Sequence, residues 1–164
     1  MADALRFRRL IAYDAWADGR IVDAIEGLDE ADLVRPREAY FGSLAQNLRH
    51  LVIVQMRWLA RWQGTPLPGA DHPLPPWREA FAASHAALRG YVEPLKDADF
   101  DRVVTYTLQS GAMRRQPLGE LVTHLVNHGT QHRAETGLLL ERIGRSPGDL
   151  DYVVFLHQAP PAGS

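Results

Sequence analysis

The feature that most constrains this chain lies in residues 116–142, where His124, His128 and His132 follow one another at intervals of four residues. Because an α-helix completes one turn in about 3.6 residues, neighbours in such a series lie on one face. Two imidazoles at this spacing can bind one transition-metal ion. The two outer histidines are about 12 Å apart along a helix axis, too far to share an ion. The spacing therefore predicts a helix with one metal-binding pair of histidines.

A helical wheel, with about 100° per residue, favours one of the two possible pairs. The apolar residues of the stretch centre about 65° from His128. His132 falls inside this apolar arc, His128 lies at its edge and His124 lies beyond it, so the inward pair is His128 and His132. Single histidines on helices are commonly surface or hydrogen-bonded core residues, and the metal hypothesis therefore requires a third ligand. The apolar residues are Leu118, Leu121, Leu125, Leu139, Leu140 and Ile143.

Composition limits which ligands and partners are possible. The 164 residues suffice for one domain with a sizeable core, and a net charge of -2 argues against a nucleic-acid partner. The chain has no cysteine, so a tightly held metal must be bound by His, Asp or Glu. The charged N-terminus lacks a signal-peptide pattern, and no apolar run approaches the roughly 20 residues of a membrane span. These features predict a cytoplasmic protein with no membrane partner.

Hydrophobic periodicity predicts four long amphipathic helices, over residues 4–26, 43–63, 77–95 and 117–143. Ser43 and Gln46 form a capping-box pattern. A proline-rich loop spans residues 64–76, and β-branched residues 103–108 before a Ser-Gly turn predict a short extended segment or hairpin. Residues 149–157 are a closing element, either helix or strand. We expect an all-α four-helix bundle over residues 1–158 and a flexible tail over 159–164.

The third metal ligand is expected from the second long helix, although that helix by itself favours an ordinary exposed histidine at His50. Bundle cores host metal sites built from facing helices, and the best candidate set is His50 with His128 and His132. Three neutral imidazoles suit zinc, nickel, copper or iron(II), and three protein ligands leave a position open for water or substrate. Glu135, one turn beyond His132, and Gln46, one turn before His50, are candidates to orient the ligand rings. Both also fit an ordinary solvated helix face.

Four segments resemble one family of bacterial proteins. They are YDAWAD at 13–18, FGSLAQNLRHL at 41–51, HLVNHGTQHR at 124–133 and DLDYVVFL at 149–156. In these segments, and over most of residues 10–156, the chain resembles the DinB/YfiT-like family of metal-dependent proteins. The resemblance implies a four-helix bundle, frequent homodimers and a divalent metal, commonly nickel or zinc.

Transferred residue by residue, the resemblance implies His50, His128 and His132 as metal ligands. His124 matches a frequent family position that is not itself a ligand, and we place it with the residues around the site. The best-characterised relatives are transferases and isomerases that use a low-molecular-weight thiol, mycothiol or bacillithiol. The mycothiol enzymes carry glutamate at a ligand position where this chain has histidine, which argues against mycothiol.

These observations lead to two functional hypotheses. The first is a metal-dependent enzyme, an S-transferase, isomerase or hydrolase, in which metal-bound water or thiol attacks a small electrophile. Arg57 or Arg133 could attract an anionic substrate in such an enzyme. The second is a non-catalytic metal-binding or stress-response protein of the damage-inducible type. A bundle with unliganded histidines is the third, simplest interpretation.

Overall fold

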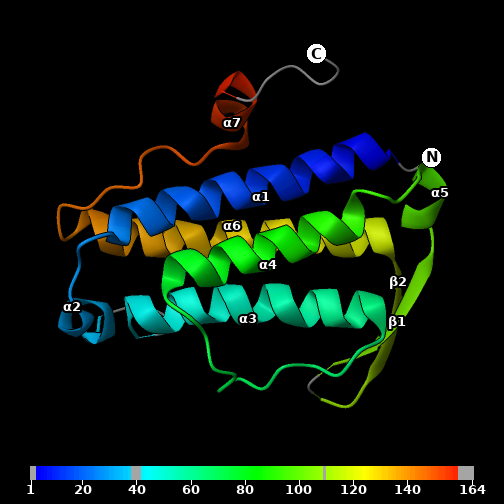
Figure 1. Ribbon diagram of the computed structural model, residues 1–164, viewed down its shortest axis with the longest axis horizontal. Helices are drawn as coiled ribbons and strands as arrows, with labels where there is room; N and C mark the ends of the chain where they lie inside the picture. Colours follow the sequence, from blue (N-terminus) through cyan, green and yellow to red (C-terminus); the bar gives the residue numbers. More distant parts are fainter. Residues whose placement is uncertain (1–2, 38–41, 109, 159–164) are drawn as a thin grey trace.

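Four long helices lie side by side and form the body of the molecule in the computed structural model, which describes residues 3–37, 42–108 and 110–158 (Figure 1). Helix α1 contacts α4 and α6, and α3 contacts the same two helices, so the four enclose a common core. The chain is mainly helical with a small antiparallel sheet. The long helices are α1 (Ala4–Ile25), α3 (Leu44–Gln63), α4 (Trp77–Val92) and α6 (Leu118–Glu141).

Shorter elements complete the described part of the chain. Helices α2 (Glu30–Val34) and α5 (Asp97–Phe100) lie in connections between the long helices. Strands β1 (Val103–Thr107) and β2 (Met113–Pro117) form an antiparallel hairpin, as one sequence alternative predicted. The closing element is a helix, α7 (Tyr152–Gln158). The predicted tail over residues 159–164 lies outside the described residues.

The boundaries of α3 follow the capping signals in the sequence. The Ser43 hydroxyl accepts a hydrogen bond from the Gln46 backbone N–H at 3.2 Å, which satisfies one of the free donors of the first turn. At the other end, Gly64 adopts a left-handed conformation with φ 69°, which an L side chain rarely takes. These two ends fix the stretch of α3 that carries His50.

Two predicted boundaries differ from the structure. Helix α4 ends at Val92 rather than near residue 95, because Pro94 has no backbone N–H to continue the helix. Pro117 was expected within the first turn of α6, but it is the last residue of β2 and the N-cap of the helix. A hydrogen bond from the Leu118 N–H to the Arg102 carbonyl, 2.9 Å long, ties this junction to the start of β1.

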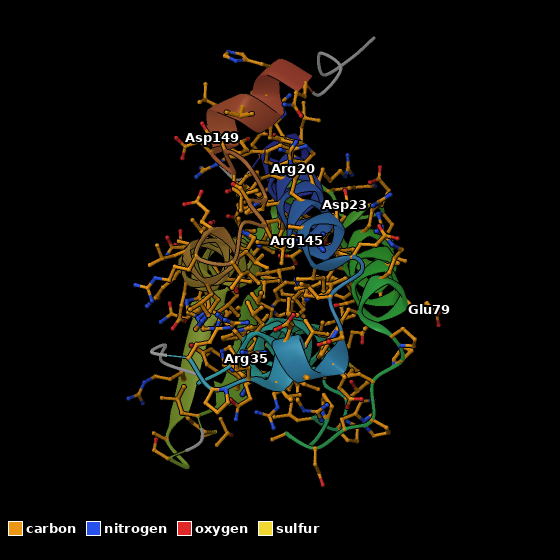
Figure 2. All side chains as sticks on the ribbon, turned by 90° about the vertical axis from the view of Figure 1, so that its left-hand side faces the viewer. Arg20, Asp23, Arg35, Glu79, Arg145 and Asp149 are labelled. Carbon is orange, nitrogen blue, oxygen red and sulfur yellow. The ribbon has the colours of Figure 1, made fainter. Side chains whose placement is uncertain are left out.

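The core fills the space between the four helices, as the end-on view in Figure 2 shows. Charged side chains such as Asp23 and Glu79 point away from it. Phe7 of α1 stacks on Phe100 of α5 with ring centroids 4.5 Å apart. No helix in the described ranges is long and apolar enough to span a membrane. Fully buried side chains in the core include Ile11, Ile21, Leu44, Leu48, Leu88, Leu118, Leu125 and Leu140.

Candidate metal centre

Three histidines from two helices converge where α3 packs against α6. His50 comes from α3, and His128 and His132 come from successive turns of α6. The Nε2 atoms of His50 and His128 are 3.1 Å apart. The His132 ring centroid lies 4.6 Å from that of His50 and 4.4 Å from that of His128. One ring nitrogen from each histidine lies within 4.8 Å of the other two, so a single ion can reach all three.

The spacing of the ring nitrogens fits a transition-metal ion. Zinc–imidazole bonds of about 2.0–2.1 Å place two nitrogens of a tetrahedral site about 3.3 Å apart. The 3.1 Å between the Nε2 atoms of His50 and His128 is close to that value. Nitrogen is also a good ligand for nickel, copper and iron(II). The donor set and its spacing therefore suit a divalent transition metal.

The surroundings of His50 and His128 keep both rings neutral. Burial, the neighbouring His132 and the charge of Arg57 lower the pKa of His50 to about 4. Burial, again with His132, and repulsion from His50 lower the pKa of His128 to about 4. At neutral pH both imidazoles are therefore uncharged. A metal ion requires this neutral form of histidine as its ligand.

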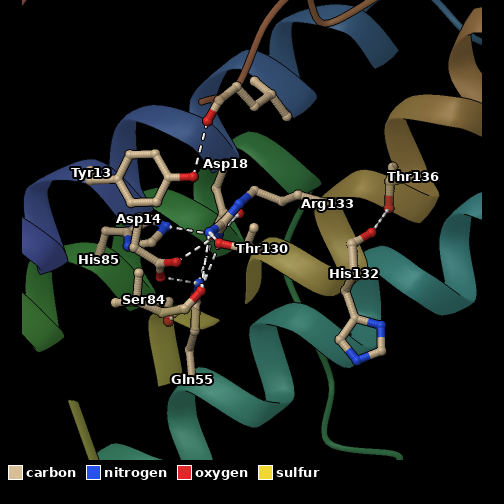
Figure 3. Close-up of polar contacts among 12 residues, drawn as sticks. Tyr13, Asp14, Asp18, Gln55, Ser84, His85, Thr130, His132, Arg133 and Thr136 are labelled. Atoms are coloured by element: carbon tan, nitrogen blue, oxygen red, sulfur yellow. Dashed lines mark hydrogen bonds and ion pairs between the residues drawn. The ribbon is translucent and has the colours of Figure 1, made fainter. Parts of the chain in front are cut away.

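His132, the buried member of the three, is held by its neighbours. The Asn47 side-chain amide donates to the His132 carbonyl and to Glu135 Oε2, both at 3.3 Å. The Thr136 hydroxyl donates to the same carbonyl at 2.8 Å (Figure 3). Glu135 Oε2 lies 3.9 Å from His132 Nδ1. A carboxylate beside Nδ1 favours the tautomer whose Nε2 lone pair is free for a metal.

His124 and Gln46, the other two residues expected around the site, differ in their contacts with the three histidine rings. The exposed His124 ring stacks on His128, with centroids 5.9 Å apart, and contacts the edge of Trp58 at 5.1 Å. Gln46 is exposed, and its Oε1 accepts a hydrogen bond from the Ser43 hydroxyl. His124 therefore extends the histidine surface along α6, and Gln46 belongs to the cap of α3.

Arg133, next in the chain to His132, is buried in an ion-pair network. Its Nη1 donates to Asp14 Oδ1 at 2.6 Å and to Asp18 Oδ1 at 3.0 Å (Figure 3). Only 1% of Arg133 is exposed, so the expectation that it could attract a substrate was wrong. Instead, the guanidinium ties α6 to α1 next to the turn that carries His132.

The network continues into α3 and α4 through neutral and titratable groups. Gln55 Nε2 donates to both aspartates, and its Oε1 accepts from the Ser84 hydroxyl at 2.8 Å. His85 Nε2 lies 2.9 Å from Asp18 Oδ2. Burial raises the pKa of Asp14, whereas Arg133 and His85 outweigh burial at Asp18 and lower its pKa. The cluster thus joins all four long helices.

The sequence pattern did not predict this network. Asp14, Asp18 and His85 could also hold a metal by proximity alone, but the Arg133 guanidinium already donates to both carboxylates. The available signal was two aspartates one turn apart on the buried face of the first helix. Buried carboxylates require a cationic partner, and that requirement could have prompted a search for one.

Comparison with known proteins identifies the family to which this chain belongs. The family model described as DinB family matches residues 1–163. The chain is also 22% identical to Protein DinB of Bacillus subtilis (strain 168), over 90% of this chain and 92% of that protein. Since the family model spans nearly every residue, this chain belongs to the DinB family.

Proposed function

We propose that this protein is a metal-dependent enzyme in which His50, His128 and His132 hold one divalent ion that activates a thiol or water. The observation that carries the proposal is the convergence of three ring nitrogens within 4.8 Å, with the His50 and His128 rings only partly buried. Three protein ligands leave a coordination position for a further molecule. Partial exposure of two ligand rings favours access by a small molecule to that position.

The chemistry of the donors narrows the choice of metal and nucleophile. Neutral imidazoles suit zinc or nickel, and such an ion lowers the pKa of a coordinated thiol or water and polarises an electrophile. The chain has no cysteine, so a thiol nucleophile must come from a small molecule. The residues of the chain then have two tasks. The histidines bind the ion, and Glu135 with Asn47 orients His132.

A second candidate function is metal binding without catalysis. The three ligands join α3 to α6, and His50 is 78 residues from His128. An ion bound there would stabilise the packing of these two helices by mass action. This alternative predicts a large fall in melting temperature on chelation and no exchangeable ligand at the ion.

The test is a thiol-transfer assay with metal-free, zinc-loaded and nickel-loaded protein. The probes are 2-mercaptoethanol as thiol and 1-chloro-2,4-dinitrobenzene or an epoxide as electrophile. We expect thiol consumption above the rate of the metal-free protein for at least one metal, and loss of that increment in His128→Ala. Rates equal to background with both metals fully bound would favour the non-catalytic alternative. Hydrolysis of ester probes by the same samples tests water as the nucleophile.

A further inference from the structure

We propose that the small molecule activated at this site carries an anionic group, which binds to Arg57 and Arg61 on the metal-facing side of α3. This inference rests on the proposed function and specifies its substrate class. An organic anion would lie along α3 and α6, with its reactive end at the histidines and its negative charge at the two arginines.

The two arginines lie on the same face of α3 as His50. Seven and eleven residues along a helix correspond to rotations of about 20° to either side of His50. The same spacing places Arg57 about 10 Å and Arg61 about 16 Å from His50 along the helix axis.

The positive charge of this pair is not neutralised within the described part of the chain. Neither arginine forms a salt bridge there, although eight salt bridges involve other residues. Burial and the charge of Arg57 lower the pKa of Arg61. Like charges one turn apart destabilise a helix, and a bound anion would offset that repulsion.

The available donors support the same assignment. Arg57 uses its Nε to donate to the Pro68 carbonyl at 2.9 Å, which anchors the side chain beside the proline-rich loop. The Nε of Arg61 is buried and has no hydrogen-bond partner among the described residues. Since the Arg57 Nε is already used and the Arg61 Nε is buried, a carboxylate or phosphate would be bound by the Nη groups of the two guanidiniums.

Aromatic rings connect the metal centre to the arginines. The Arg61 guanidinium carbon lies 4.8 Å from the centre of the Trp58 ring. Trp58 contacts Tyr106 of β1 and His124 of α6, each with centroids 5.1 Å apart. His124 in turn stacks on the proposed ligand His128. This ring surface suits the apolar or flat part of a ligand, as in most small-molecule sites.

The charges also predict the orientation of the ligand. At the opposite end of the site, the Glu135 carboxylate lies beside His132. A negative group would be repelled there and attracted toward Arg57 and Arg61. The anionic end should therefore extend from the histidines toward the C-terminal half of α3 and the hairpin.

The test compares two thiols that differ only in charge. Isothermal titration calorimetry of the zinc-loaded protein would use 6-mercaptohexanoate and the neutral 6-mercaptohexan-1-ol. We expect the acid to bind about tenfold more tightly, since hydrogen bonds to a charged group are stronger than neutral ones. The preference should largely disappear in Arg61→Gln and in Arg61→Gln combined with Arg57→Gln. It should persist in Arg89→Gln, which removes an exposed arginine of α4. Zinc content is measured in every sample.

Three other outcomes would each contradict either the anion inference or the proposed thiol activation. Equal affinities for the two thiols in the wild-type protein would overturn the anion inference and leave thiol activation standing. A preference for the acid that survives in both arginine variants would also overturn it, since the attraction would then come from elsewhere. Absence of binding by either thiol, with zinc still in place, would overturn thiol activation itself and this inference with it.

Discussion

The Nε2 atoms of His50 and His128 lie 3.1 Å apart, although 78 positions separate the two residues in the chain. This contact exists only when α3 and α6 are packed together. Metal binding at the three histidines, as we propose it, would therefore be coupled to tertiary structure rather than to one helix alone. The same coupling means that residues away from the ring nitrogens can control metal affinity by fixing where each helix lies.

The first prediction concerns Glu135. Replacing it by Gln keeps the shape of the side chain but removes the negative charge 3.9 Å from His132 Nδ1. We expect metal affinity to fall by about 10–100-fold, as for other groups that orient a ligand histidine. Competition with a chromogenic chelator measures this affinity. Glu141→Gln, an exposed change on the same helix, is the control, and equal affinities in the two variants would contradict the proposed role.

The second prediction concerns the buried Arg133. Arg133→Met leaves Asp14 and Asp18 buried without their cation, and such a loss costs about 3–5 kcal/mol of unfolding free energy. Urea denaturation of the metal-free protein measures it. Arg78→Met removes an exposed arginine that also pairs with two carboxylates, Asp23 and Glu26. We expect a much smaller loss there, because exposed ion pairs contribute little.

The third prediction concerns two glycines of α6 with different surroundings. A Cβ at Gly129 would lie 2.7 Å from Arg133 Nη1 and 2.9 Å from Asp14 Oδ1, so Gly129→Ala should destabilise the fold by about 1–3 kcal/mol. A Cβ at Gly137 would meet its nearest atom, of Pro147, at 3.5 Å. Gly137→Ala should therefore stabilise the fold by roughly 0.5–1 kcal/mol. Thermal or urea denaturation compares them, and changes of the same sign would contradict the packing described.

The fourth prediction concerns acid stability of the metal-free protein. His50 and His128 have a pKa of about 4 in the fold, whereas an unfolded histidine titrates near about 6.5. Between these values the unfolded chain binds more protons, so the free energy of unfolding should decrease as the pH falls from about 6.5 toward 4. Below that range the two histidines no longer contribute to the free energy of unfolding.

His128→Gln tests this dependence, because it removes one of the histidines responsible. The variant should lose stability less steeply than the wild type over the same pH interval. Contributions from the aspartate network are common to both proteins and cancel in the difference. Parallel curves of unfolding free energy against pH would show that the low pKa of His128 is not a feature of the fold.

Much of the fold could be predicted from the sequence because its signals are local. The capping pattern at Ser43 and the conformational freedom of Gly64 depend on a few neighbouring residues, and both ends of α3 lie where they indicate. The choice of His128 and His132 as the inward pair uses only the helical spacing and the position of the apolar arc on the same helix. The early end of α4 was missed although Pro94 was visible, because an apolar residue at 95 extended the pattern.

The partners of α6 could not be predicted in the same way. A wheel places Arg133 about 75° from the centre of the apolar arc, near enough to its edge that either burial or exposure is possible. The outcome depends on how α1 is rotated against α6, which brings Asp14 and Asp18 to the guanidinium. The contact between His50 and His128 could not be predicted from one helix either, since it requires two helices to pack in a particular register.

The most direct test of the account is the metal content of the protein purified without an affinity tag. Inductively coupled plasma mass spectrometry would compare wild type, His128→Ala and a control, His157→Ala, which changes an exposed histidine of α7. After loading with zinc or nickel and removal of excess metal, we predict about one ion per chain in wild type and control, and almost none in His128→Ala. No bound metal in the wild type, or equal metal in all three proteins, would contradict the assignment of His50, His128 and His132 as a metal centre.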